Sequence, residues 1–223
     1  MIDHASTYRS HNLRHWHHRM RLRQLLREVA EFDSAPLIAD IGCSNGYITN
    51  ILNDVCRGEV HGFDYLPELI DEARSAYPHI HFQRADLNRN VRWSKQFDLV
   101  CCFETLEHVG DLTAALKNIL AAVRPGGVLI VSVPVETGPW GIAKFCAKTL
   151  LGYPLDEIAA GRSEYFWALL TGNDVSAFRR NKYTWGTHFG FDWRDVEESF
   201  SADMTITRAY TKYATRIIVA RKA

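Results

Sequence analysis

The sequence of 223 residues lacks the features that would point to a membrane or to a nucleic acid. No apolar stretch approaches the roughly 20 residues of a membrane helix, and the stretch Val128 to Val133 has only the length of a strand. Lys and Arg together number 26, as do Asp and Glu, so the formal net charge is zero. A neutral chain has no overall attraction for nucleic acid or for an anionic membrane. We therefore expect a small-molecule partner, no membrane and no nucleic acid.

Cysteine is also scarce, and its pattern excludes a disulfide framework. The chain has five cysteines, an odd number, with no C-x-x-C spacing and no signal peptide. We expect reduced thiols in a cytoplasmic protein.

A third missing feature is the G-x-G-x-x-G fingerprint of dinucleotide-binding proteins. The apolar run Leu37 to Ile41 predicts a buried strand, and after it Gly42 and Gly46 flank Ser44, which stands in place of the middle glycine. Asp40, just before this turn, suits a cationic ligand better than a pyrophosphate. The next apolar run ends in Asp64, which is placed to accept ribose hydroxyls. The pattern predicts a nucleotide pocket and favours a ligand other than a dinucleotide.

Helix and strand patterns alternate along the chain. A helix is expected from Asn12 to Glu31, followed by helix and strand pairs at 48–55 and 59–64, 66–76 and 80–84, and 112–123 and 128–135. The runs 204–210 and 215–220 are close enough to form an antiparallel hairpin. We predict one doubly wound α/β domain over residues 1–223.

At this point the chain resembles the class I, Rossmann-like S-adenosylmethionine-dependent methyltransferases, in their small-molecule branch. The resemblance rests on the segments 37–47, 64–65, 85–87, 97–109 and 123–134, in the family's order. It implies a mostly parallel seven-stranded sheet that ends in an antiparallel hairpin. It also implies a set of residues that bind S-adenosylmethionine: Asp40, Gly42, Cys43, Ser44, Gly46, Asp64, Tyr65, Asp86, Leu87, Phe103 and Glu104.

Two segments outside this pattern are candidate walls of the site. Residues 136–188 are rich in aromatic side chains, with helical patterns at 141–151 and 155–169, and predict a helical lid insertion. Residues 1–31 predict an N-terminal helical cap rich in arginine and histidine. One of its arginines, Arg14 or Arg19, could bind the carboxylate of the methionine moiety.

The candidate residues for activating the methyl acceptor lie in the segment after the strand that ends at Phe103. His108 and Glu107 are the candidate bases there. In a helical turn, Glu104, Glu107 and His108 would share one face, and His188 could join them as metal ligands. This alternative resembles the small-RNA 3′-terminal 2′-O-methyltransferases, but quinone-biosynthesis O-methyltransferases carry the same five-residue pattern.

We expect a methyltransferase that acts on a small molecule, at oxygen. Two alternatives stay open: a metal-assisted RNA 3′-terminal 2′-O-methyltransferase, and a binder of S-adenosylmethionine without catalysis. The sequence carries no motif that names the acceptor or the oligomeric state.

Overall fold

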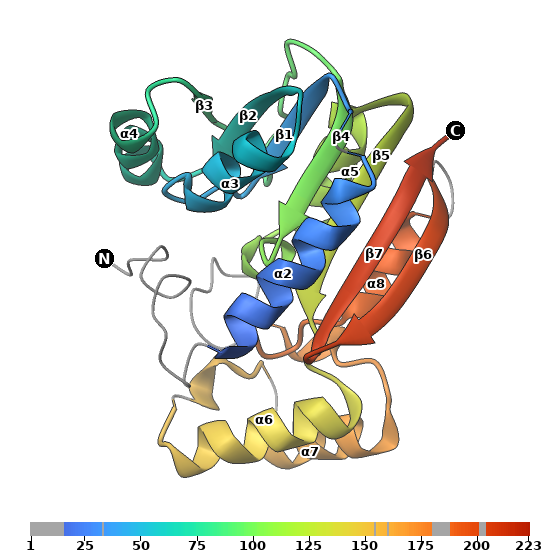
Figure 1. The fold of residues 1–223 in the computed structure, drawn as a ribbon. Helices are drawn as coiled ribbons and strands as arrows, with labels where there is room; N and C mark the ends of the chain where they lie inside the picture. Colours follow the sequence, from blue (N-terminus) through green and yellow to red (C-terminus); the bar gives the residue numbers. More distant parts are fainter. Residues whose placement is uncertain (1–15, 33, 154, 160, 180–187, 201–203) are drawn as a thin grey trace.

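A computed structural model describes residues 16–223 apart from 33, 154, 160, 180–187 and 201–203 (Figure 1). Its first element, helix α2 (Trp16–Ala30), lies within the helix predicted from Asn12 to Glu31. The start of that predicted helix, with Arg14, lies outside the described residues.

The described residues form one seven-stranded sheet, as the resemblance implied, and its strand order is β3-β2-β1-β4-β5-β7-β6. The first five in this order are parallel, whereas β7 pairs antiparallel with both β5 and β6. The strands are β1 (Leu37–Ile41), β2 (Glu59–Asp64), β3 (His81–Arg84), β4 (Phe97–Phe103), β5 (Val123–Pro134), β6 (Met204–Lys212) and β7 (Thr215–Lys222).

Helices cover both faces of this sheet, which explains why its central strands are mostly apolar. On one face, α2 and α3 (Tyr47–Val55) pack their leucines against β1 and β4. On the other face lie α5 (Leu112–Ala122) and α8 (Trp193–Ser199), which pack on β4, β5 and β7. A fifth helix, α4 (Pro67–Ala76), packs against β3. The doubly wound architecture is therefore confirmed.

The predicted lid insertion forms a separate lobe below the sheet in Figure 1. It contains α6 (Gly138–Leu150), the 3-10 turn η3 (Leu155–Glu157), α7 (Arg162–Thr171) and the turn η4 (Ser176–Phe178). The helix predicted over 155–169 is wrong in its first half. The chain is extended at Gly161, and α7 begins only after it, where Glu164 accepts a hydrogen bond from the Gly161 N–H.

Several lid aromatics form a small core of their own, centred on the buried Tyr165. Phe145, Phe178 and Phe189 make ring contacts with Tyr165, and its hydroxyl accepts a hydrogen bond from the Gly190 N–H at 3.3 Å. These rings stabilise the lobe rather than line a substrate site.

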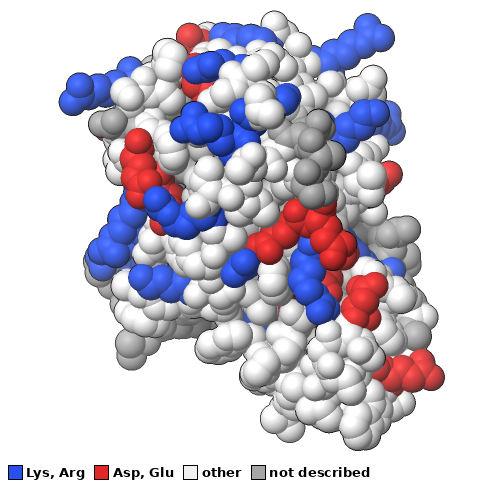
Figure 2. Space-filling model, turned by 90° about the vertical axis from the view of Figure 1, so that its right-hand side faces the viewer, with Lys and Arg blue, Asp and Glu red and all other residues white. Residues whose placement is uncertain are grey.

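Charged side chains of both signs alternate over the upper part of the face in Figure 2, and the lower part of this face carries few of either. Among the described residues, no helix combines the length and the apolar character needed to cross a membrane.

Candidate active site

A cavity of about 730 Å³ opens at the carboxyl ends of β1, β2 and β4. Parallel sheets bind ligands at this edge, because the loops that follow the strands meet there. The cavity is also lined by residues of α2, of α6 and of the hairpin turn between β6 and β7. Its size is within the range of small-molecule sites.

The loop between β1 and α3 is held close to the end of β4. Gly42 has a φ of +84°, and a Cβ on it would lie 2.0 Å from the Thr105 hydroxyl oxygen. Gly46 also has a positive φ of +80° and begins α3, so the N–H groups of that helix face the cavity edge. Only glycine fits at these positions without strain. Cys43 and Ser44, which lie between the two glycines, line the cavity.

The acid predicted to bind ribose is fixed by the same loop. Asp64 ends β2, and its two carboxylate oxygens accept hydrogen bonds from the N–H groups of Ser44 and Leu66 at 2.9 and 3.0 Å. Each carboxylate oxygen can accept a second hydrogen bond, so the group remains able to bind two hydroxyls. Tyr65 lines the cavity beside it.

Asp40 and Asp86 occupy different settings from Asp64. Asp40 is buried and accepts a hydrogen bond from the Thr49 hydroxyl at 2.7 Å. Burial raises the pKa of Asp40 to about 7, so its negative charge is only partial near neutrality. Asp86 accepts from the N–H and the side-chain amide of Asn88; Leu87 and Asn88 line the cavity, whereas Asp86 does not.

Two buried polar atoms of the glycine loop suit an absent ligand. Among the described residues, Ser44 Oγ and Asn45 Oδ1 are buried without a hydrogen-bond partner. Such atoms normally have partners, since an unsatisfied buried group costs about 1–3 kcal/mol. The glycine loop, Asp64 and these two atoms therefore fit S-adenosylmethionine, whose adenosine and methionine parts present hydroxyl, amino and carboxylate groups.

Glu104 is placed differently from the prediction. Its φ of +49° ends β4 in a left-handed turn, so it does not continue into the 3-10 turn η2 (Leu106–His108). Its carboxylate accepts hydrogen bonds from Arg21 at 2.7 Å and from Ser132 at 3.0 Å. The helical grouping with Glu107 and His108 is wrong for this reason. Phe103, just before it, lines the cavity.

Arg21 was not one of the two arginines proposed from sequence to bind the carboxylate of the methionine moiety. It lines the cavity from α2, whereas Arg19 does not, and Arg14 lies outside the described residues. Helix periodicity could have indicated Arg21 from the sequence. It precedes the buried Leu25 by one turn and therefore lies on the same side of α2.

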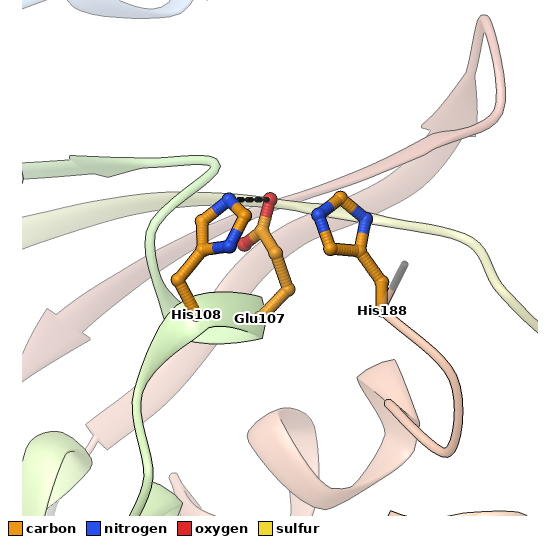
Figure 3. Close-up of side chains that lie close together, drawn as sticks. All are labelled: Glu107, His108 and His188. Atoms are coloured by element: carbon orange, nitrogen blue, oxygen red, sulfur yellow. Dashed lines mark ion pairs between the residues drawn. The ribbon is translucent and has the colours of Figure 1, made fainter. Parts of the chain in front are cut away.

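Glu107, His108 and His188 all line the cavity and come together there (Figure 3). Ligand-type atoms of the three side chains lie within 4.8 Å of one another. The His108 Nε2 lies 3.9 Å from the Glu107 Oε1, and the two imidazole rings meet edge to face with centroids 4.7 Å apart. The structure thus joins the two predicted catalytic residues to the predicted fourth ligand, 80 residues later in the chain.

The carboxyl group of Glu107 is buried, with 1% of the residue exposed. Burial, reinforced by the negative charge of Glu104, raises the pKa of Glu107 well above its usual range. Burial therefore favours the neutral form of this carboxyl group in the absence of a cation, which disfavours Glu107 as the base.

Glu136 follows β5 and was not identified from sequence as a site residue. Its carboxylate lies 2.8 Å from the Lys144 Nζ, 3.6 Å from the Lys148 Nζ and 3.6 Å from the His188 Nδ1. Burial acts to raise the pKa of Glu136, but contact with His188 and the two lysine charges outweigh it and lower the pKa to about 2. Glu136 is therefore ionised and anchors His188.

Arg179 is a second residue that the sequence did not reveal. Its guanidinium donates to the carbonyl oxygens of Glu107 and Val109 at 3.1 and 2.6 Å, which fixes the turn that carries Glu107 and His108. Neither Glu136 nor Arg179 belongs to a short motif, so only the tertiary structure shows their roles.

Comparison with known proteins agrees with this geometry. Residues 5–166 match the family model of the methyltransferase domain, which is well over half of the chain. A ubiquinone biosynthesis O-methyltransferase of Coxiella burnetii is 33% identical over 100 residues, 43% of this chain and 42% of that protein. A trans-aconitate 2-methyltransferase of Escherichia coli is 34% identical over 112 residues, 50% of this chain and 44% of that protein. The alignments thus span about half or less of these two relatives.

A solved structure with the same fold is magnesium protoporphyrin IX methyltransferase from Synechocystis, with bound SAH (S-adenosylhomocysteine). Its TM-score is 0.63 at 16% identity, over 94% of this chain and 85% of that chain. The family match, the fold and the glycine loop agree, and the chain belongs to the methyltransferase-domain family, within the class I S-adenosylmethionine-dependent methyltransferases.

Proposed function

We propose that this protein transfers the methyl group of S-adenosylmethionine to an oxygen atom of a small molecule. The observation that carries the proposal is that one cavity holds both halves of the reaction. The glycine loop and Asp64 line the part that we assign to the cofactor, and Glu107, His108 and His188 line the part that we assign to the acceptor, called the acceptor end below.

The cofactor end would be held by the residues described above. Asp64 and Tyr65 suit the ribose, Leu87 and Asn88 suit the adenine, and Arg21 with Glu104 suits the charged end of the methionine moiety. When bound, S-adenosylmethionine supplies a methyl carbon on a sulfonium, which transfers by in-line displacement. The protein's main task is therefore to orient the acceptor and to exclude water.

Oxygen is favoured because the acceptor end offers a group that can remove a hydroxyl proton. His108 is the group that can accept this proton, and a weakly acidic hydroxyl needs such help. One relative supports this choice, since it is an O-methyltransferase of ubiquinone biosynthesis. A small acceptor is favoured because the cavity, which α6 and the hairpin turn help to line, has the volume of a small-molecule site.

The first test is binding of S-adenosylmethionine, measured by titration calorimetry. We expect saturable binding that Asp64→Ala weakens by at least about tenfold, equivalent to about 1.4 kcal/mol. Asp71→Ala is the matched control, because this exposed acid lies on α4 outside the cavity. Absence of binding by the unmodified protein would contradict the proposal.

The second test is turnover, measured as release of S-adenosylhomocysteine with a panel of phenols, catechols, hydroxylated quinones and carboxylic acids. At least one oxygen acceptor should support turnover, and His108→Ala should lower the rate by about 10²-fold or more. Tight cofactor binding with no release across the panel would instead support the non-catalytic alternative.

A further inference from the structure

We propose that Glu107, His108 and His188 form a binding site for a divalent transition-metal ion at the acceptor end of the cavity. Two imidazoles and one carboxylate are a ligand set that holds Mn²⁺, Fe²⁺, Co²⁺ or Zn²⁺ and leaves open positions for a substrate. The role of such an ion in activating the acceptor rests on the proposed function, whereas the binding of the ion does not.

The geometry requires only a small adjustment. Ligand atoms at about 2.1 Å from an ion lie roughly 3 to 4.2 Å from one another. The three ligand-type atoms here lie within 4.8 Å of one another. Side-chain rotations that move these atoms by less than about an ångström would bring them to the spacing of metal ligands. Figure 3 shows the three side chains grouped from two separate parts of the chain, with Glu107 between the two histidines.

The carboxyl group of Glu107 gives the independent sign that something binds here. Its Oε2 is buried and has no hydrogen-bond partner among the described residues, yet the side chain lines the cavity. A carboxyl group buried in this way is unfavourable unless a proton or a cation compensates it. An ion in contact with Glu107 would satisfy the oxygen and favour the ionised carboxylate.

His188 is oriented as metal-binding histidines are. Its Nδ1 lies 3.6 Å from the ionised Glu136, so a proton on Nδ1 faces that carboxylate and Nε2 is left as the nitrogen for an ion. Lys144 and Lys148 neutralise Glu136 from α6, which keeps it a partner of His188 rather than a competing ligand. The backbone of His188 has a φ of +56°, an uncommon conformation that the fold maintains at this position.

The identity of the ion follows from the position of Glu104. This carboxylate is bound by Arg21 and Ser132, so it is not available as the second oxygen ligand that the sequence suggested. The remaining set has more nitrogen than oxygen. Mg²⁺ and Ca²⁺ prefer oxygen ligands, so the site should favour first-row transition metals over both.

In the full reaction the ion would hold the acceptor oxygen and lower the pKa of its hydroxyl, as metal ions do with bound water. The proton leaves to solvent, and His108 then acts as a ligand rather than as a free base. The oxygen takes the methyl carbon as the carbon–sulfur bond breaks, with its electron pair left on sulfur.

The test is a titration of chelator-treated, untagged full-length protein with CoCl₂, followed by the visible absorption of bound Co²⁺. We expect one ion per chain with the spectrum of nitrogen and oxygen coordination. His188→Ala and Glu107→Gln should each weaken binding at least about tenfold. His79→Ala is the matched control, an exposed histidine outside the cavity that should not change binding, and the N-terminal histidines are the same in every variant.

Two further measurements distinguish a loss of metal binding from unfolding of a variant and from failure of the proposed function. Circular dichroism and thermal unfolding establish that each variant is folded, and calorimetry with S-adenosylmethionine on the same samples tests the proposed function separately. Competition should show displacement of Co²⁺ by Zn²⁺ but not by a large excess of Mg²⁺. No stoichiometric binding by the unmodified protein, unchanged binding by folded His188→Ala, or ready displacement by Mg²⁺ would each overturn the proposal.

Discussion

Glu107 shows most clearly that the fold can bury an ionisable side chain that would be more stable in water. The carboxyl group lies in the protein interior, where its charged form is disfavoured, although a histidine is close by. Residues in such settings tend to belong to functional sites, because stability alone gives no reason to keep them. The free energy of unfolding of the metal-free protein should therefore depend on the ionisation of Glu107.

Glu107→Gln should stabilise the metal-free protein at high pH and not at low pH. The pKa of Glu107 is raised in the folded state, so the folded protein binds this proton more tightly than the unfolded chain does. Folding stability then falls as the pH rises above the unfolded value near 4.5, and continues to fall until the folded pKa is reached. Glutamine does not ionise, so the variant does not lose stability in this way as the pH rises.

Urea unfolding of both proteins at about pH 5 and pH 8, with chelator present, checks this expectation. The gain in the free energy of unfolding should be near zero at the lower pH and clearly positive at the higher one, by at most about 1.4 kcal/mol for each pH unit. A difference that does not change with pH would contradict the setting assigned to Glu107.

Gly42→Ala should destabilise the protein through a steric clash as well as through its backbone. The new Cβ would lie 2.0 Å from the Thr105 hydroxyl oxygen, so the end of β4 would have to move. Gly152→Ala is the control, since Gly152 has a φ of +73° and open space around it. Both changes carry the conformational penalty of about 1 kcal/mol, and the clash should add roughly 1–3 kcal/mol at Gly42 alone. Equal losses in chemical denaturation would argue against the close contact with Thr105.

At the scale of elements, α2 contributes to the site as well as covering the sheet. Its buried Leu25 and Val29 pack on the sheet, while Arg21 reaches Glu104 at the end of β4. Toward the other end of the helix, Glu28 binds the hydroxyl of Tyr210 and the guanidinium of Arg208 on β6. The helix therefore links the edge of the sheet to the cavity wall.

Arg21→Ala should weaken binding of S-adenosylmethionine by roughly tenfold without unfolding the protein. The change removes a cation from the cavity wall and leaves Glu104 with Ser132 as its remaining partner among those described. Arg23→Ala is the matched control, because Arg23 is exposed on the same helix. Calorimetry that gives equal affinities for the two variants would contradict a role for Arg21 in binding the cofactor.

For the molecule as a whole, the sequence predicted the sheet correctly because the evidence for it is local. Each of these patterns, the short apolar runs, the glycine turns and the tight hairpin, can be recognised from about ten consecutive residues. The sequence also named Glu107, His108 and His188. It misjudged Glu104, since helical spacing was assumed where the backbone makes a left-handed turn, and it missed Glu136 and Arg179, whose partners are distant in the chain.

The neutral charge of the whole chain also makes a prediction about partners. With equal numbers of basic and acidic residues, and both signs interspersed on the face in Figure 2, we expect no salt-sensitive binding of RNA. Fluorescence anisotropy of a labelled single-stranded RNA at about 50 and 200 mM salt is the measurement. Tight binding at the lower salt that is lost at the higher one would favour the RNA methyltransferase alternative.

The strand order has a consequence for how the molecule folds. Strand β7 lies between β5 and β6, so β6 joins the sheet only through a strand that follows it in the chain. The two-residue turn at Tyr213 and Ala214 allows β6 and β7 to pair locally first, and the same turn then completes one wall of the cavity. Ligand-binding competence should therefore be among the last properties that a newly made chain acquires, after the parallel part of the sheet can already form.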